Sequence, residues 1–540
     1  MQIRILLALA LAGAPAIGWA QPGPVIDQPR ADREPPGTNP PPAPVRGRTS
    51  PDVEVEAQGR PSTALRQVVV EGSSLPAASL SAAFAPLVGR PLGQQTIEAA
   101  AKAAADLYKR SDVALYTVAA PRQDLTTGVL RLQAIEGYIA QTALQGDVKD
   151  RDLKLVSAHA RKLASEKPLK RRTLERRLSL IRDIPGLTVD AKLLPGKAPG
   201  AVVLVLDLQQ QGPTVNLSVN NRGSSILGRT QFQADLDLFS TFRQGDQTRL
   251  SLGLPTDVDR FQYYAVQHSQ PLGDDGVRLQ ASGGYFRTRP DNGTKGKATF
   301  GGVQVSYPLI RSYEQNLYLT GALDGLDSEN AVFGQGVATE RTRVARGAAA
   351  WSLAKPKRQA SASGTVSVGI DGLGARTTAG IADADFVKVN LRGGYDQALG
   401  ERWVLRFKAA GQFTSDLLPS SEQFSVGGSE FGRAFEQSIV IGDQGAAASA
   451  ELAWRPPGLP KAIAGSEVYG FADTAQVTQT GRFGAPDRDY DLTSVGGGVR
   501  LAFGKRAGLG LEGAYGLEDP RPGHDSSWRL GVNVAVKPKE

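Results

Sequence analysis

The chain has 540 residues, a net charge of +8 and no cysteine. Its length is enough for two to four domains, and the absence of cysteine excludes disulfides, thiolate metal sites and a lipid-modified N-terminal cysteine. A basic balance can indicate nucleic-acid binding, but the start of the chain predicts an exported protein, which rarely meets nucleic acid. We therefore attribute the charge to surfaces of the folded protein.

The N-terminus has the pattern of a secretory signal peptide. Arg4 precedes an apolar run from Ile5 to Ile17, and Gly18 and Ala20 are small residues near its end. The run is shorter than the roughly 20 residues that a membrane-spanning helix needs. We predict a signal peptide over residues 1–20, cleaved after Ala20, and no transmembrane helix beyond it.

The next segment, residues 21–65, is rich in proline. It holds eleven prolines, among them Pro40-Pro41-Pro42. Proline lacks the backbone donor that helices and sheet ladders need. This composition predicts an extended or disordered linker.

Residues 66–210 repeat one order of elements, strand, helix, helix, strand, strand. In the first repeat Ile97, Ala101, Ala104 and Tyr108 fall at helical spacing. We predict two tandem α+β domains, at 66–136 and 137–210. The expected strands and helices are Gln67–Val70, Gln94–Tyr108, Val113–Val118 and Gly128–Ile135, then Ile139–Leu144, Asp152–Leu163, Lys170–Ile184, Val189–Leu193 and Ala201–Leu208.

From about residue 214 the helical period gives way to alternation of apolar and polar residues. Segment 231–238, for example, alternates glutamine or aspartate with apolar side chains. Many runs reach the roughly 9–11 residues that a tilted strand needs to cross a bilayer. Backbone groups in lipid must be paired, so such strands have to close into a barrel. The apolar stripe then faces lipid and the polar stripe faces a wet lumen.

We count sixteen strands in this region, an even number that suits a bacterial barrel. The predicted fold is mainly β, a 16-stranded transmembrane β-barrel over 214–540 behind two small α+β domains. One connection, 414–445, is unusually long, and its glycines and aromatic residues favour a folded, inserted loop. The strands centre near 217, 235, 250, 264, 281, 302, 319, 347, 366, 389, 407, 449, 470, 497, 511 and 532.

No arrangement of residues predicts catalysis, a metal site or a cofactor. His159, His268 and His524 are isolated from any Ser/Asp or ligand-spaced partners, and we read them as surface or lumen side chains. The sequence therefore predicts that the chain is not an enzyme. Segment 149–177 carries eleven Lys and Arg against four acidic residues. It is either a contact face for an exported client or a solvated pair of helices.

Short motifs in a fixed order connect these regions to a known family. In the α+β region they are Val70-Glu71-Gly72, Gly89-Arg90-Pro91-Leu92, Pro121-Arg122-Gln123-Asp124-Leu125, Gly128, Glu136-Gly137, Leu174-Glu175-Arg176, Asp183-Ile184-Pro185-Gly186, Pro195-Gly196 and Pro199-Gly200. In the barrel region they are Gly245-Asp246, Gln270-Pro271-Leu272-Gly273, Phe424-Ser425-Val426-Gly427-Gly428, Gly432-Arg433-Ala434-Phe435, Gly442-Asp443-Gln444-Gly445 and Glu451-Leu452. Over roughly 66–536 the chain resembles the two-partner secretion transporters, the ShlB/FhaC/HecB hemolysin secretion/activation proteins.

The resemblance implies an outer-membrane location with the two α+β domains, POTRA modules, in the periplasm. It implies a transporter that recognises a partner exoprotein, an adhesin or hemolysin, within 66–210, and secretes and activates it through the barrel. It also implies that Arg433 on the long loop pairs with an aspartate in a Phe-x-Asp motif on the thirteenth strand, here Phe471-Ala472-Asp473. We expect a bidentate Arg433–Asp473 pair to lock the loop, with Phe435 beside the arginine.

The chain departs from the family pattern at three points. Ala434 replaces the glycine that usually follows the loop arginine, the proline-rich 21–65 segment disfavours an N-terminal helix that plugs the barrel, and the chain continues past Val536 without a terminal aromatic residue. Two alternatives stay open, a factor that inserts other proteins into the membrane and a passive porin. The presence of two α+β modules argues against both, because membrane-insertion factors related to this family typically have more than two such modules and porins need none.

Overall fold

The computed structural model describes residues 52–146, 148, 153–291, 294–332, 335–504, 506–518, 520 and 527–538. Four of our predictions lie outside these residues: the signal peptide, the absence of an N-terminal plug helix, most of the linker, and the position of His524. The described chain forms two compact units that divide between Gln210 and Gln211.

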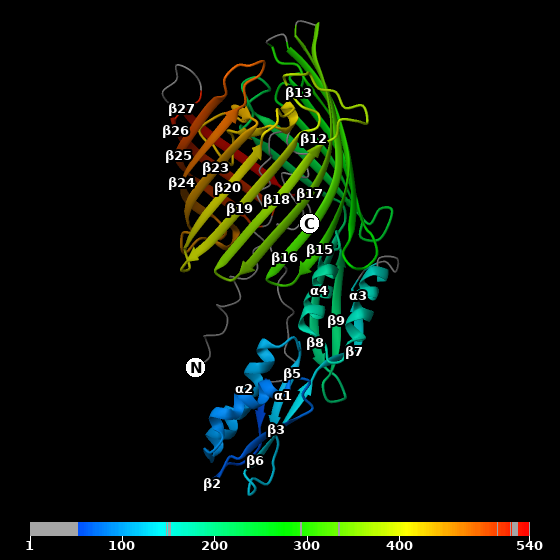
Figure 1. Cartoon of the computed structure of the whole chain (residues 1–540), viewed down its shortest axis with the longest axis vertical. Helices are drawn as coiled ribbons and strands as arrows, with labels where there is room; N and C mark the ends of the chain where they lie inside the picture. Colours follow the sequence, from blue (N-terminus) through cyan, green and yellow to red (C-terminus); the bar gives the residue numbers. More distant parts are fainter. Residues whose placement is uncertain are drawn as a thin grey trace. The chain divides into compact units, whose positions relative to one another are not determined.

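The first α+β domain packs two helices against a mixed sheet of order β1-β5-β6-β3 (Figure 1). The predicted helical face of α2 forms its core, since Ile97, Ala101, Ala104 and Tyr108 are fully buried. A second, two-stranded sheet pairs β2 with β4. The elements are β1 (Val53–Val55), β2 (Arg60–Ala64), β3 (Gln67–Glu71), α1 (Ala77–Phe84), η1 (Ala85–Leu87), β4 (Pro91–Leu92), α2 (Gln94–Arg110), β5 (Tyr116–Ala120) and β6 (Val129–Glu136).

The predicted linker ends earlier than we expected. Val53–Val55 pairs in parallel with β5, and Arg60–Ala64 pairs with β4. The prediction of an extended or disordered linker up to residue 65 is therefore wrong for its last part. Only one proline, Pro61, falls in this stretch, and the partners of both strands lie far along the chain, where local composition gives no signal.

The second α+β domain has the sheet order β7-β9-β8. Helix α3 packs against β7 and α4 packs against β8. His159, which we expected on a surface or in the lumen, is instead buried on α3. The elements are β7 (Tyr138–Gln145), α3 (Lys154–Ala164), α4 (Arg171–Arg182), β8 (Leu187–Pro195) and β9 (Ala201–Gln210).

The second unit is a closed antiparallel barrel, and all sixteen predicted strands are confirmed (Figure 1). Each strand pairs with its neighbour along the chain, except that β20 pairs with β23 across the long loop and β27 pairs with β10 to close the cylinder. The strands are β10 (Thr214–Asn220), β11 (Gln231–Phe239), β12 (Gln247–Pro255), β13 (Phe261–Pro271), β14 (Arg278–Thr288), β15 (Thr294–Arg311), β16 (Gln315–Val332), β17 (Gln335–Lys355), β18 (Arg358–Gly369), β19 (Val387–Leu399), β20 (Trp403–Thr414), β23 (Gln444–Trp454), β24 (Glu467–Gln479), β25 (Arg488–Phe503), β26 (Ala507–Glu518) and β27 (Ser527–Val536).

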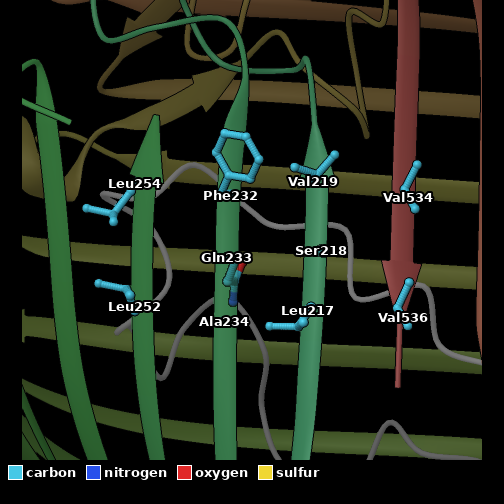
Figure 2. A pocket seen from close by; sticks show the side chains of 10 residues that line it. All are labelled: Leu217, Ser218, Val219, Phe232, Gln233, Ala234, Leu252, Leu254, Val534 and Val536. Carbon is cyan, nitrogen blue, oxygen red and sulfur yellow. The ribbon is translucent and has the colours of Figure 1, made fainter. Parts of the chain in front are cut away.

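The alternation of side chains places apolar residues on the outer wall. Leu217, Phe232 and Leu250 are each more than 40% exposed. Leu217 and Phe232, together with Leu252, Leu254, Val534 and Val536, line the outer surface of the neighbouring strands β27, β10, β11 and β12 (Figure 2). Charged residues such as Asp237 and Arg346 are buried on the inner face. Among the described residues, no helix is long and apolar enough to span a membrane.

We predict that Tyr108→Phe destabilises the first α+β domain. The Tyr108 hydroxyl donates to Glu136 Oε1 at 2.6 Å, and burial, followed by the hydrogen bond to Glu136, raises the pKa of the phenol, so it stays protonated as the donor. Losing this bond should lower the free energy of unfolding of segment 52–210 by about 1 kcal/mol, measured by urea unfolding.

The matched control is Tyr138→Phe, because Lys167 lies over the Tyr138 ring and a phenylalanine ring keeps that contact. Its effect should stay within roughly 0.5 kcal/mol. Equal losses for the two variants would show that the Tyr108–Glu136 hydrogen bond contributes nothing to stability.

Candidate functional site

The connection from β20 to β23 folds into the interior of the barrel. It contains a short helix, η3 (Ser420–Glu422), and a two-stranded sheet of β21 (Phe424–Val426) and β22 (Val440–Gly442). Phe424, Phe431 and Phe435 form one buried cluster with Phe471 and Leu492, which lie on barrel strands. The loop therefore packs against the inner wall through this shared cluster, and its tip, residues 427–439, reaches that wall.

Arg433 at the loop tip contacts three carboxylates from three strands. Its Nη1 lies 3.1 Å from Glu451 Oε2 on β23 and 3.4 Å from Glu512 Oε2 on β26, and its Nε lies 3.6 Å from Asp473 Oδ2 on β24. Nη2 donates to Ser449 Oγ at 3.1 Å. The arginine side chain is 6% exposed, so these partners replace the water that the charge has lost.

Our expectation that Arg433 and Asp473 form a bidentate pair is wrong. Asp473 Oδ1 accepts hydrogen bonds from the backbone N–H of Gly432 at 2.7 Å and from Ser494 Oγ at 2.5 Å. Among the residues that the structure describes, neither Arg433 Nε nor Asp473 Oδ2 has a hydrogen-bond partner. Asp473 thus holds the loop backbone and attracts Arg433 over a longer distance, while the fork of the arginine points to Glu451 and Glu512.

Two aromatic residues complete the contact at the tip. The guanidinium carbon of Arg433 lies 4.1 Å from the centre of the Phe471 ring, which places the cation over the negative face of the ring. Phe435 is 2% exposed and lies against Gly516 of β26, where a Cβ atom would come within 2.6 Å of the Phe435 ring. Arg433, Phe435, Phe471 and Asp473, the four residues predicted for the lock, therefore lie at one place on the inner wall.

The same carboxylates also bind other arginines, which the sequence reasoning did not identify. Arg500 donates to Glu451 through Nη1 at 2.6 Å and through Nη2 at 2.8 Å, and Arg406 donates to Glu451 at 2.8 Å. Arg222 forms an ion pair with Glu512 and donates to the backbone oxygen of Arg433 at 3.1 Å. Alternation placed Arg406 on the charged face of its strand but gave no information on which strands face each other across the lumen. Arg222 follows β10, outside any alternating segment.

The base of the loop is fixed by two further charge clusters. Glu422 is 2% exposed and lies 2.9 Å from both Arg346 Nη2 and Lys388 Nζ. Asp443 binds Arg482 through Nη1 at 2.6 Å and Nη2 at 2.8 Å. Burial acts to raise the pKa of Asp443, but its hydrogen bonds, that from Arg482 foremost, outweigh burial and lower the pKa below its ordinary value. The loop is thus held at its base as well as at its tip.

These clusters pair carboxylates with guanidinium groups and with the ammonium group of Lys388. Within the described ranges no group of three or more His, Cys, Asp or Glu residues is arranged to hold a metal ion. The arrangement can hold a loop inside a barrel or release it.

Comparison with known proteins supports one assignment. The family model for the haemolysin secretion/activation protein ShlB/FhaC/HecB matches residues 200–501, and the ShlB-type POTRA domain model matches residues 63–137. The outer membrane transporter CdiB of Escherichia coli is 25% identical over 441 residues, covering 77% of this chain and 73% of that protein. The hemolysin transporter protein HpmB of Proteus mirabilis is 25% identical over 430 residues, with coverage of 72% and 70%.

The solved structure of CdiB from Escherichia coli superimposes with a TM-score of 0.71 at 20% identity, covering 88% of this chain and 90% of that chain, which shows a shared fold. The family match spans more than half of the chain and, with the closed barrel, establishes an outer-membrane protein with periplasmic POTRA domains. The chain belongs to the haemolysin secretion/activation protein family ShlB/FhaC/HecB.

Proposed function

We propose that the protein recognises a partner exoprotein in the periplasm through residues 66–210 and secretes it through the barrel lumen. The observation that carries this proposal is the loop of residues 415–443, which is held inside the lumen by charged contacts at its tip. Hydrogen bonds and ion pairs of this kind can exchange for contacts with a passing chain. A lumen closed by a removable loop fits regulated export better than the passive diffusion of a porin.

The relatives support this assignment by what their names say of them. CdiB of Escherichia coli is an outer membrane transporter, and HpmB of Proteus mirabilis is a hemolysin transporter. The family description adds activation to secretion. We propose by analogy that the client is a secreted adhesin or hemolysin, and that the protein activates it during export.

The second POTRA domain offers an edge on which an extended client can bind. Strand β8 pairs with β9 and, within the described residues, with no other strand. An open edge adds a strand through backbone hydrogen bonds, which tolerate many sequences. The domain also has a basic character, with twelve Lys and Arg against five acidic residues in 138–146, 148 and 153–210, which favours a client segment with acidic side chains.

We predict that deletion of residues 52–210 abolishes secretion of the client but leaves the barrel in the outer membrane. The barrel unit has its own closed sheet and its own core, so it should still migrate as a heat-modifiable protein in membrane fractions. Secretion is measured as the client protein in the culture medium. Secretion at the level of the full-length chain would contradict the proposed role of the POTRA domains.

A second prediction concerns the loop tip. Arg433→Ala should lower secretion at least tenfold, because the tip loses its contacts to Glu451, Glu512 and Asp473 together, and each charge-assisted contact is worth about 1.5–3 kcal/mol. Arg433→Lys should not restore secretion, since an ammonium group lacks the planar fork that reaches several carboxylates. Client in the medium is measured at equal amounts of folded barrel.

The controls for the loop tip use other lumen residues. Arg249→Ala removes a lumen arginine that pairs with Asp237 away from the loop, and secretion should be retained. Asp473→Asn keeps an oxygen that can accept from Gly432 N–H and should be milder than Asp473→Ala. If Arg433→Lys secretes like the parent protein, or if Arg249→Ala is as damaging as Arg433→Ala, the tip contacts do not set the function of the loop.

A further inference from the structure

The rim of the barrel at which the chain enters β10 carries an uneven distribution of charge. Because neighbouring strands are antiparallel, the turns after β11, β13, β15, β17, β19, β23 and β25 all lie at this rim. It is the periplasmic rim, since the POTRA domains precede β10. The turns divide into two halves by charge, one from β11 to β16 and the other from β17 to β26.

The half from β17 to β26 is basic and the other half is acidic. The first three turns hold one basic residue, Arg243, against Asp246, Asp274, Asp275 and Glu314. The described residues of the other four turns hold one acidic residue, Glu401, against Lys357, Arg402, Arg455, Lys461 and Arg506, and all five basic side chains are exposed. The turns from β17 to β26 therefore give one side of the rim a positive potential.

The same half of the rim also carries tryptophan. Trp403 begins β20 and Trp454 ends β23, and the two are directly opposite in the strand register, with ring centres 6.3 Å apart. Trp403 is 44% exposed, and it shares the outward face with Phe407, while Val404 between them is buried. Arg402 precedes Trp403 and Arg455 follows Trp454, so each tryptophan has an arginine as its chain neighbour at the membrane boundary. The two arginines are also joined, because the backbone N–H of Arg455 donates to the carbonyl of Arg402 at 2.8 Å.

We propose that this half of the rim, the basic strip of Lys357, Arg402, Trp403, Trp454, Lys461 and Arg506, binds anionic phospholipid headgroups of the periplasmic leaflet. Tryptophan rings settle at the level of the headgroups, and Lys and Arg beside them attract the phosphate of a lipid. The other half of the rim offers these headgroups a single basic turn residue, Arg243. Anionic lipid therefore gathers on one side of the barrel, from β17 to β26, next to the closing strand β27, where the exposed Lys537 donates its backbone N–H to the carbonyl of Arg506.

This inference is independent of the transport function, because it concerns the outer wall and the rim and involves no client. The probe is the full-length protein in detergent, with phosphatidylglycerol or phosphatidylethanolamine added, and bound lipids counted by native mass spectrometry. The test variant is Arg402→Glu/Lys461→Glu/Arg506→Glu. The matched control reverses three exposed charges at the opposite rim, Arg289→Glu/Lys295→Glu/Arg488→Glu, so that both variants have the same net charge.

The parent protein should retain phosphatidylglycerol in preference to phosphatidylethanolamine. Each reversed charge in the basic strip should weaken binding of phosphatidylglycerol roughly fivefold or more, and the control variant should bind like the parent. Phosphatidylglycerol carrying brominated chains should quench tryptophan fluorescence more than the brominated phosphatidylethanolamine does, and Trp403→Phe/Trp454→Phe should remove that difference. Heat-modifiable migration confirms that each variant is folded.

Three outcomes would overturn the proposal. The first is equal retention of the two lipids by the parent protein. The second is an equal loss in the test and control variants, which would show a general charge effect. The third is full displacement of phosphatidylglycerol by inorganic phosphate at a matched concentration, which would show that the strip binds the free anion and not the lipid.

Discussion

The barrel depends on the pairing of its first strand with its last, because every backbone group in lipid needs a partner and an open edge has none. This closure is short. Strands β10 and β27 share four residue pairs, Leu217–Asn220 with Val536–Asn533, whereas β26 and β27 share ten. The Asn221 side chain extends the closure by accepting from the backbone N–H of Val532 at 2.8 Å and donating to the carbonyl of Leu530 at 2.8 Å.

The loop tip lies beside this closure, since Arg222 donates to the carbonyl of Arg433 and Ser527 Oγ donates to that of Ala434. One loop therefore contacts residues on both sides of the closure.

A shared network of charges explains why Arg433 does not form an isolated pair. Glu451 binds Arg406, Arg433 and Arg500, and Glu467 binds Arg406 and Arg500. A buried carboxylate is stabilised by each cation beside it, so an Arg433 directed wholly to Asp473 would remove part of the positive charge that offsets Glu451 and Glu512. Distributing one guanidinium over three carboxylates lowers the cost for all of them. The same distribution means that no single strand holds the tip.

The sequence predicted the elements of the fold better than their partners. All sixteen strands were found because a wall between lipid and water imposes alternation on every strand, including the weakly patterned β17, β18 and β23. The residues of the lock were found through the motifs that carry the family resemblance. Glu512 was missed because alternation assigns a side chain to the lumen but not to a position around it, and Arg222 was missed because it follows β10 and lies outside the alternating segments. The strand Val53–Val55 was missed for a related reason, since its partner β5 lies more than sixty residues away.

The backbone of the loop tip explains why Ala434 can stand after the arginine, where the family usually has glycine. The N–H of Phe435 bonds to the carbonyl of Gly432 at 3.0 Å, so residues 432–435 form a turn with Arg433 and Ala434 at its centre. The positive φ of this segment, 73°, falls on Gly432, and Ala434 is not among the residues with positive φ. Central positions with negative φ accept alanine without strain, whereas a side chain at Gly432 would also press on the backbone of Gly427, 3.2 Å away. The glycine that the turn requires therefore lies before the arginine in this chain, and it is the same residue whose N–H binds Asp473.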